Sequence, residues 1–198
     1  MRRTVAFLFA ALALAALCGC GAKPAVTSAA LTEREKALLS AQSEQCFVFD
    51  YSAGEWQWAS LWAEEYRKGE KAGTYELSAW SLDMDDKGTI VLYIPRTNGE
   101  DSKQLNLTVM QGGAIYSRAD VIPEFGEIYN EGGVAWQTCP SGDIPESGKK
   151  VLLCIRCCPN GFSPLGDLFI DYEAGLEELA DDEASYIIGV TFSGEQPK

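Results

Sequence analysis

The 198-residue sequence contains no histidine. Without histidine the chain cannot build a Ser-His-Asp or Cys-His relay, a histidine-ligated zinc or haem site, or a histidine pH switch. Paired carboxylates can still carry out acid–base chemistry, so the exclusion is partial. The sequence therefore favours a protein that is not an enzyme, and it predicts no cofactor and no metal site.

Positive charge is also scarce. The chain has 16 Lys and Arg against 29 Asp and Glu, which gives a formal net charge of −13. Nucleic acids and anionic lipid head groups are themselves polyanions, so this balance disfavours both as partners. It suits a solvated surface or a basic partner.

No apolar run is long enough to span a bilayer, which takes roughly 20 residues. The longest run, Val5 to Leu17, has about a dozen residues and follows Arg2 and Arg3. A basic start, a short apolar stretch and small residues at its end are the three regions of a secretory signal peptide. We therefore expect residues 1–19 to be a cleaved signal.

The end of this segment resembles the bacterial lipobox. Leu17-Cys18-Gly19-Cys20 has an aliphatic residue three positions before a cysteine and small residues between them. The resemblance implies cleavage after Gly19 and a diacylglyceryl thioether on Cys20, so that the protein is lipid-anchored to the extracytoplasmic face of a cell membrane. An ordinary cleaved signal without lipid is the alternative.

The remainder divides into a tether and one domain. Residues 20–31 are small and polar and include Pro24, a composition typical of a flexible linker. Thr32 and Glu35 have the spacing of a capping box and predict a short helix over residues 32–42. We expect residues 32–198 to form a single domain.

From Cys46 onward the pattern is that of short strands separated by turn residues. The fold class that this pattern predicts is mostly β, an antiparallel two-sheet sandwich of about eight or nine strands with the short helix at its N-terminal end. A single helical turn is expected at Leu176–Leu179. The predicted strands cover residues 46–51, 55–66, 74–80, 89–94, 105–109, 114–117, 134–138, 151–157 and 186–192.

The segment 55–66 carries the most interesting side chains. Its even positions hold Trp56, Trp58, Trp62 and Tyr66, an aromatic face at strand spacing, although a helix also fits part of the pattern. If this face points inward it is sandwich core. If part of it is exposed, it forms a binding surface on which a sugar ring or a peptide could stack.

Five cysteines follow Cys20, an odd number that leaves at least one thiol unpaired within the chain. Cys154 and Cys157 have the CxxC spacing, but in a strand they face opposite ways, whereas Cys154 and Cys158 face the same way. Buried thiols, one disulfide and a metal or redox site all remain open. The five residues are Cys46, Cys139, Cys154, Cys157 and Cys158.

Together these features predict a membrane-tethered, non-enzymatic module that binds a protein, a peptide or a component of the cell envelope. No nucleic-acid partner is expected. The alternative is an envelope enzyme that works with carboxylates and needs no histidine. The carboxylates available to it are Glu64, Glu65, Asp171 and Glu173.

Overall fold

The computed structural model describes residues 23–82, 86–96, 103–122, 125–126, 134–158, 164–166 and 168–197. Its strands are β1 (Ala25–Ser28), β2 (Ser43–Ser52), β3 (Trp58–Arg67), β4 (Glu70–Ser81), β5 (Lys87–Pro95), β6 (Asn106–Gln111), β7 (Ala114–Arg118), β8 (Val134–Thr138), β9 (Gly142–Asp143), β10 (Lys149–Cys157) and β11 (Ala184–Ser193). Its helices are α2 (Glu33–Gln42), α4 (Tyr172–Gly175) and the 3₁₀ turn η1 (Leu176–Leu179).

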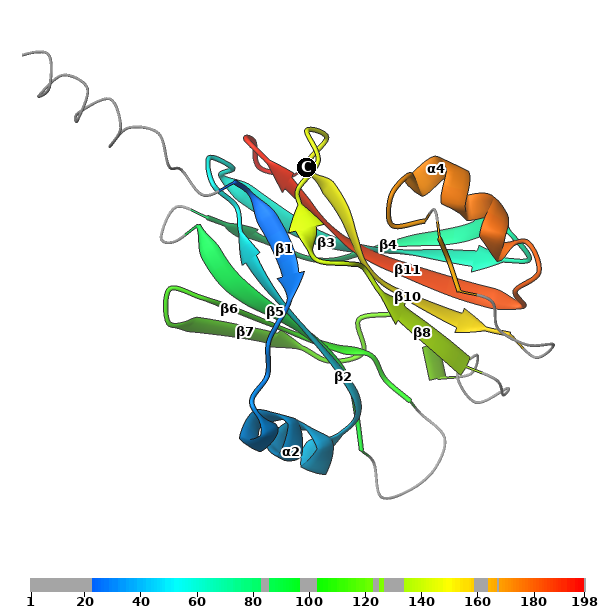
Figure 1. Cartoon of the computed structure of the whole chain (residues 1–198), viewed down its shortest axis with the longest axis horizontal. Helices are drawn as coiled ribbons and strands as arrows, with labels where there is room; N and C mark the ends of the chain where they lie inside the picture. Colours follow the sequence, from blue (N-terminus) through cyan, green and yellow to red (C-terminus); the bar gives the residue numbers. More distant parts are fainter. Residues whose placement is uncertain are drawn as a thin grey trace, which may run out of the picture.

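The strands form two antiparallel sheets that pack face to face (Figure 1). The first sheet, sheet A, has the order β7-β6-β5-β2-β1-β9, and the second, sheet B, has the order β4-β3-β11-β10-β8. The predicted two-sheet sandwich is confirmed, with two short strands, β1 and β9, in addition to those expected.

The core lies between the sheets and follows the alternation of each strand. Phe47, Phe49 and Tyr51 of β2 are buried, whereas Val48 is half-buried on the other face of the same strand. Across the core, Ala59 and Leu61 of β3 are buried among the side chains of sheet A. This period of two explains why the sequence pattern identified the fold class.

Two hairpins have the tight turns that right-twisted strands favour. Lys68 and Gly69, between β3 and β4, have φ of 51° and 78°, and Gly112 and Gly113, between β6 and β7, have φ of 54° and 82°. Two successive positive φ values are required by a type I′ turn. The first of these turns is confined to Lys68 and Gly69, because β4 begins at Glu70.

The N-terminal helix is confirmed, together with its capping box. The Glu35 backbone N–H donates to Thr32 Oγ1 at 3.3 Å, and the Thr32 N–H donates to Glu35 Oε2 at 2.7 Å. The prediction of a flexible tether is wrong for residues 25–28, because they form β1 and pair with β2 and β9. Val26 of this segment is fully buried in the main core, although the composition of residues 20–31 is that of a linker. In the described part of the chain, no helix has the length and apolar character needed to cross a membrane.

A second layer covers the outer face of sheet B. Helix α4 and η1 lie against this sheet on the side away from sheet A (Figure 1). The helical turn predicted at Leu176–Leu179 is present and continues α4. A second apolar cluster holds this layer in place and comprises Tyr66, Val151, Cys154, Leu165, Leu168, Leu179 and Ile187.

Candidate functional site

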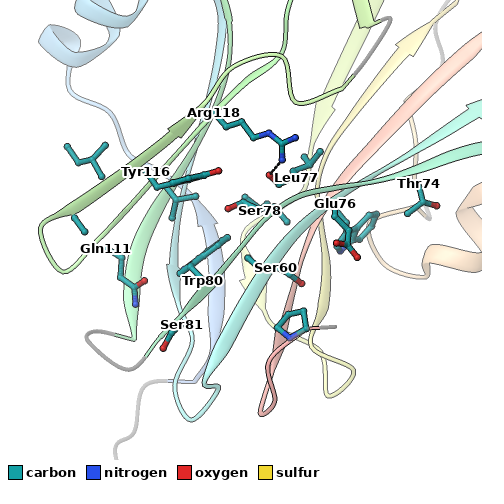
Figure 2. A pocket seen from close by; sticks show the side chains of 17 residues that line it. Ser60, Thr74, Glu76, Leu77, Ser78, Trp80, Ser81, Gln111, Tyr116 and Arg118 are labelled. Carbon is teal, nitrogen blue, oxygen red and sulfur yellow. Dashed lines mark hydrogen bonds between the residues drawn. The ribbon is translucent and has the colours of Figure 1, made fainter.

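A cleft of about 740 Å³ opens where an edge of one sheet lies beside an edge of the other. Strand β4 borders it from sheet B, and β6 and β7 border it from sheet A. Figure 2 shows Trp80 and Ser78 of β4 and Tyr116 and Arg118 of β7 among the side chains that line this space. In the described part of the chain, each of these two strands has one edge without a neighbouring strand, and the cleft lies between them.

The β6–β7 hairpin gives this edge an apolar surface. Ile115 is 70% exposed, Tyr116 50% and Met110 36%, and these are three of the five large apolar side chains exposed in the described residues. Met110 and Ile115 are direct cross-strand neighbours, while Tyr116 pairs with Val109 and lines the cleft. Exposed apolar groups that cluster beside a cleft are typical of a binding surface.

Arg118 crosses from one edge to the other. Its Nη1 donates a hydrogen bond of 3.0 Å to the carbonyl oxygen of Leu77 on β4, drawn as a dashed line in Figure 2. Among the described residues, no carboxylate lies within ion-pair distance of Arg118. The cleft therefore contains a guanidinium group whose charge has no counter-ion in the described part of the chain.

Trp80 forms the wall opposite Tyr116 and is fixed from behind by the core. Its indole N–H donates to Tyr51 Oη at 3.1 Å, and the two rings lie 6.1 Å apart. Tyr51 is buried and approaches β5 so closely that a Cβ on Gly88 would lie 2.4 Å from its hydroxyl oxygen. Trp80 thus presents a rigid apolar surface, with little conformational entropy to lose on binding.

The aromatic face predicted from even positions does not form one surface. Segment 58–67 is a strand, as preferred, but its even positions point to the outer face of sheet B, since Ala59, Leu61 and Ala63 occupy the core. Trp56 precedes the strand and packs on the main core, whereas Trp58 belongs to neither apolar cluster.

Trp62 and Tyr66 lie beneath the α4 layer. The Trp62 indole N–H donates to Thr191 Oγ1 at 3.0 Å, and its ring meets Tyr172 edge-on at 6.1 Å. The Lys149 ammonium lies 4.3 Å from the Trp62 ring centre and 4.0 Å from that of Tyr172. These aromatic groups therefore have partners within the chain, but Trp62 also lines the cleft, so one member of the predicted aromatic surface lies at the candidate site.

Glu64 is the centre of a polar network in the same layer. Its Oε1 lies 2.8 Å from Lys71 Nζ and 3.7 Å from Lys149 Nζ, and its Oε2 accepts hydrogen bonds from the hydroxyls of Tyr66, at 2.8 Å, and Tyr172. Burial alone would raise the pKa of Glu64, but these hydrogen bonds and the nearby lysines outweigh it and hold the pKa below its usual value. Burial and Glu64 raise the pKa of Tyr66 to about 12 and that of Tyr172 further.

A buried ion pair ties the end of this layer to β10. Arg156 donates from Nε to Asp182 Oδ2 at 2.5 Å and from Nη2 to Asp182 Oδ1 at 2.7 Å, and both side chains are 3% exposed. Ser185 Oγ donates to the same carboxylate at 2.6 Å. Both oxygens of the Asp182 carboxylate thus accept hydrogen bonds from side chains of the same chain.

The five described cysteines are all free thiols, and four of them are buried. Cys154 belongs to the outer cluster and Cys157 to the main core, so the CxxC pair faces opposite ways, as its strand spacing predicted. Cys158 donates to Asp182 at 3.2 Å, and its burial and this carboxylate raise the pKa of its thiol to about 11. Burial also raises the pKa of the Cys46, Cys139 and Cys154 thiols, which makes them poor nucleophiles.

The remaining predicted sites can also be located. Glu65 accepts from Arg67 at 2.6 Å and from Tyr75 at 2.6 Å, and Asp171 caps α4 through the Ala174 N–H at 3.3 Å. With Glu64 committed to its own network, these carboxylates do not converge on the cleft, and Glu173 does not line it either. Cys20 and the lipobox lie outside the described residues.

Sequence reasoning missed Trp80, Tyr116 and Arg118. Trp80 and Tyr116 lie in predicted strands, where an aromatic residue indicates core as readily as a site, and Arg118 directly follows one. The available signal was Ala114–Arg118, a short segment after a Gly-Gly turn with an apolar residue on each face. Edge strands are commonly very short, so the length of this segment was the available indication of an edge.

The fold and the cleft define a β-sandwich module with an open edge site. The chain belongs to the YgaN domain family, whose model matches residues 25–156. The match begins at the first residue of β1 and includes β4, β6 and β7, which border the cleft. Comparison with curated proteins and with solved structures found no significant match.

Proposed function

We propose that this protein is a lipoprotein, held through Cys20 on the extracytoplasmic face of a cell membrane, that binds a segment of a peptide or protein in the cleft between β4 and β7 and catalyses no reaction. The observation that carries the binding role is the cleft itself. It combines exposed Ile115 and Tyr116, a fixed Trp80 and the unpaired charge of Arg118. Aromatic and arginine side chains are enriched among the residues that dominate binding energy at interfaces.

The shape of the site favours a peptide over a compact small molecule. The cleft runs beside strand edges, which bind extended chains through their backbone groups. The carboxylates of the alternative, Glu64 and Glu65, accept hydrogen bonds or ion pairs from their neighbours. Arg118 and the exposed side chains of the cleft therefore support the binding role, whereas Glu64 and Glu65 are engaged with neighbouring side chains.

Site-specific photo-crosslinking in cells tests the binding role. A photoreactive amino acid replaces Tyr116 in the full chain, and a matched protein carries it in place of Leu38, an exposed apolar residue of α2 remote from the cleft. We expect a discrete adduct from position 116, none from position 38, and loss of the adduct when Trp80→Ala is added. The same adducts from both positions would contradict the proposal.

The anchor has its own test. Metabolic labelling with a palmitate analogue should mark the protein, because two or more acyl chains at Cys20 are what hold such a protein at a membrane. Cys20→Ala should abolish the label, while Cys46→Ala, a half-buried thiol of β2, should leave it unchanged. Persistent labelling of the Cys20→Ala protein would refute the assignment.

A further inference from the structure

The register of the β6–β7 hairpin determines which backbone groups its open edge presents. Gln111 and Ala114 flank a two-residue turn, and such a pair exchanges both of its backbone hydrogen bonds. Hydrogen-bonded pairs alternate along an antiparallel ladder, so the backbone groups of Tyr116 and Arg118 point toward β6. The N–H and C=O groups of Ile115 and Ser117 therefore point away from the sheet, toward an edge at which no described strand pairs.

Resting on the function proposed above, we infer that the partner binds by adding an antiparallel strand to β7. This strand carries an apolar residue opposite Tyr116 and an acidic residue opposite Arg118. Its backbone would complete the hydrogen bonds of Ile115 and Ser117. Side chains directly across from each other share one face of a sheet, so these two residues would point into the cleft.

The chemistry of the two positions differs. The residue opposite Tyr116 enters the space in front of Trp80, where burial of an apolar side chain is favourable. The residue opposite Arg118 meets a guanidinium that the described residues leave without a carboxylate, and a bidentate carboxylate is its best partner. Because the strands run in opposite directions, the recognised pattern reads, from N- to C-terminus, acidic residue, any residue, apolar residue.

A second copy of the chain fits this edge less well. Strand β7 reads Ala114-Ile115-Tyr116-Ser117-Arg118 and contains no acidic residue. Antiparallel pairing of two copies about Tyr116 would place Ala114 of the other copy across from Arg118, so both guanidinium groups would stay without counter-ions. Two chains of net charge −13 also repel each other. The charges therefore favour a peptide of different sequence.

Selection from a library of random heptapeptides displayed on phage tests the inference, with the full chain purified in detergent as bait. We expect the unaltered chain to enrich acidic–any–apolar peptides, and Arg118→Glu to enrich peptides with a basic residue in place of the acidic one. Tyr116→Ala is the site control, since this exposed side chain can be removed without unfolding the core. Leu38→Ala is the remote control and should select the same peptides as the unaltered chain.

Backbone methylation then tests the strand itself. In the selected peptide, the middle residue lies opposite Ser117 and its N–H would bond β7, so N-methylation there should weaken binding about tenfold or more. The N–H of the apolar residue opposite Tyr116 points away from β7, so N-methylation there should change affinity by less than about threefold.

The outcomes separate the two proposals. Three results would overturn the added strand while leaving the binding cleft in place, provided that binding depends on Tyr116. They are peptides without an acidic preference, peptides with the two residues in the reverse order, and equal sensitivity of binding to both methylations. Peptides that ignore Tyr116→Ala, or no enrichment at all, would overturn both. A dimer of the full chain that Ile115→Asp dissociates would also overturn the inferred partner, because β7 would then be occupied by a second copy.

Discussion

The covered outer face of sheet B and the open edge between β4 and β7 carry the same kinds of side chain. In the first region these side chains bind one another, whereas in the second they remain exposed. Beneath α4 and η1, Arg156 binds both oxygens of Asp182, and all three groups of the Trp62–Tyr172–Lys149 set contact one another. At the open edge, Arg118 binds one carbonyl oxygen, and Tyr116 is half exposed. The difference lies in how many of the contacts available to each group are made within the chain.

This contrast separates structural groups from groups available for binding. A buried charge needs a partner, because an isolated one costs several kcal/mol, so Arg156 and Asp182 stabilise the fold only as a pair. An exposed charge such as Arg118 remains hydrated and gains little from a partner in the same chain. Residue type alone cannot distinguish the two regions, but the number of partners can.

The largest expected effect comes from breaking the buried arginine pair. Arg156→Met should lower the free energy of unfolding by about 3–5 kcal/mol, because it leaves the Asp182 carboxylate buried without its ion partner. Urea denaturation followed by tryptophan fluorescence measures the change. Arg118→Met is the matched control and should change stability by no more than about 1 kcal/mol, because it removes one exposed-edge hydrogen bond. Equal losses in the two variants would show that Arg118 is as structural as Arg156.

The second prediction concerns pH. Glu64→Gln should lower stability at pH 7 by about 1.5–3 kcal/mol, since it removes charge-assisted hydrogen bonds and the ion pair with Lys71. Because the pKa of Glu64 is below its usual value in the folded state, its stabilisation is complete above the unfolded pKa and is lost as pH falls through the folded pKa. The gap between the variant and the unaltered protein should therefore narrow as the pH is lowered from 7 to 3, measured by urea denaturation at each pH.

Glu76→Gln is the control for that experiment, because Glu76 is exposed at the cleft. Surface substitutions of this kind usually change stability by no more than about 0.5 kcal/mol. A gap for Glu64→Gln that stayed constant down to pH 3 would mean that its carboxylate contributes through packing and not through charge.

Much of the fold could be predicted because it depends on local patterns. Alternation in β2 and β3, the capping box at Thr32 and the Gly112-Gly113 turn are each visible within a few residues. Strand β1 could not be predicted, because its four residues resemble a linker and become a strand only through pairing with β2 and β9. Strand β1 is stabilised by pairing with strands distant in the sequence, and this pairing cannot be inferred from the composition of its own four residues.

The site was harder to predict than the fold for the same reason. The cleft exists because β4 and β7 are both edges, and strand order depends on pairings across the whole chain. The period of two correctly placed Trp62 on one side of β3 but could not say which side faced the core, because α4 and η1 cover the outer face with a second apolar layer. Whether an aromatic residue is bound within the chain or available to a partner depends on such tertiary contacts.

The smallest expected effect compares the two type I′ turns. Gly69 and Gly113 occupy the same turn position, with φ of 78° and 82°, so an added Cβ should cost each about 1 kcal/mol of backbone strain. A Cβ on Gly113 would meet nothing within 4 Å, whereas one on Gly69 would lie 3.0 Å from the Cα of Ala180, in the segment that follows η1. Gly69→Ala should therefore destabilise the protein more than Gly113→Ala, and thermal denaturation of the two variants measures the difference. Equal losses of stability would mean that the segment after η1 moves to accommodate the methyl group at position 69. The layer over sheet B would then be as deformable at this end as the β6–β7 hairpin.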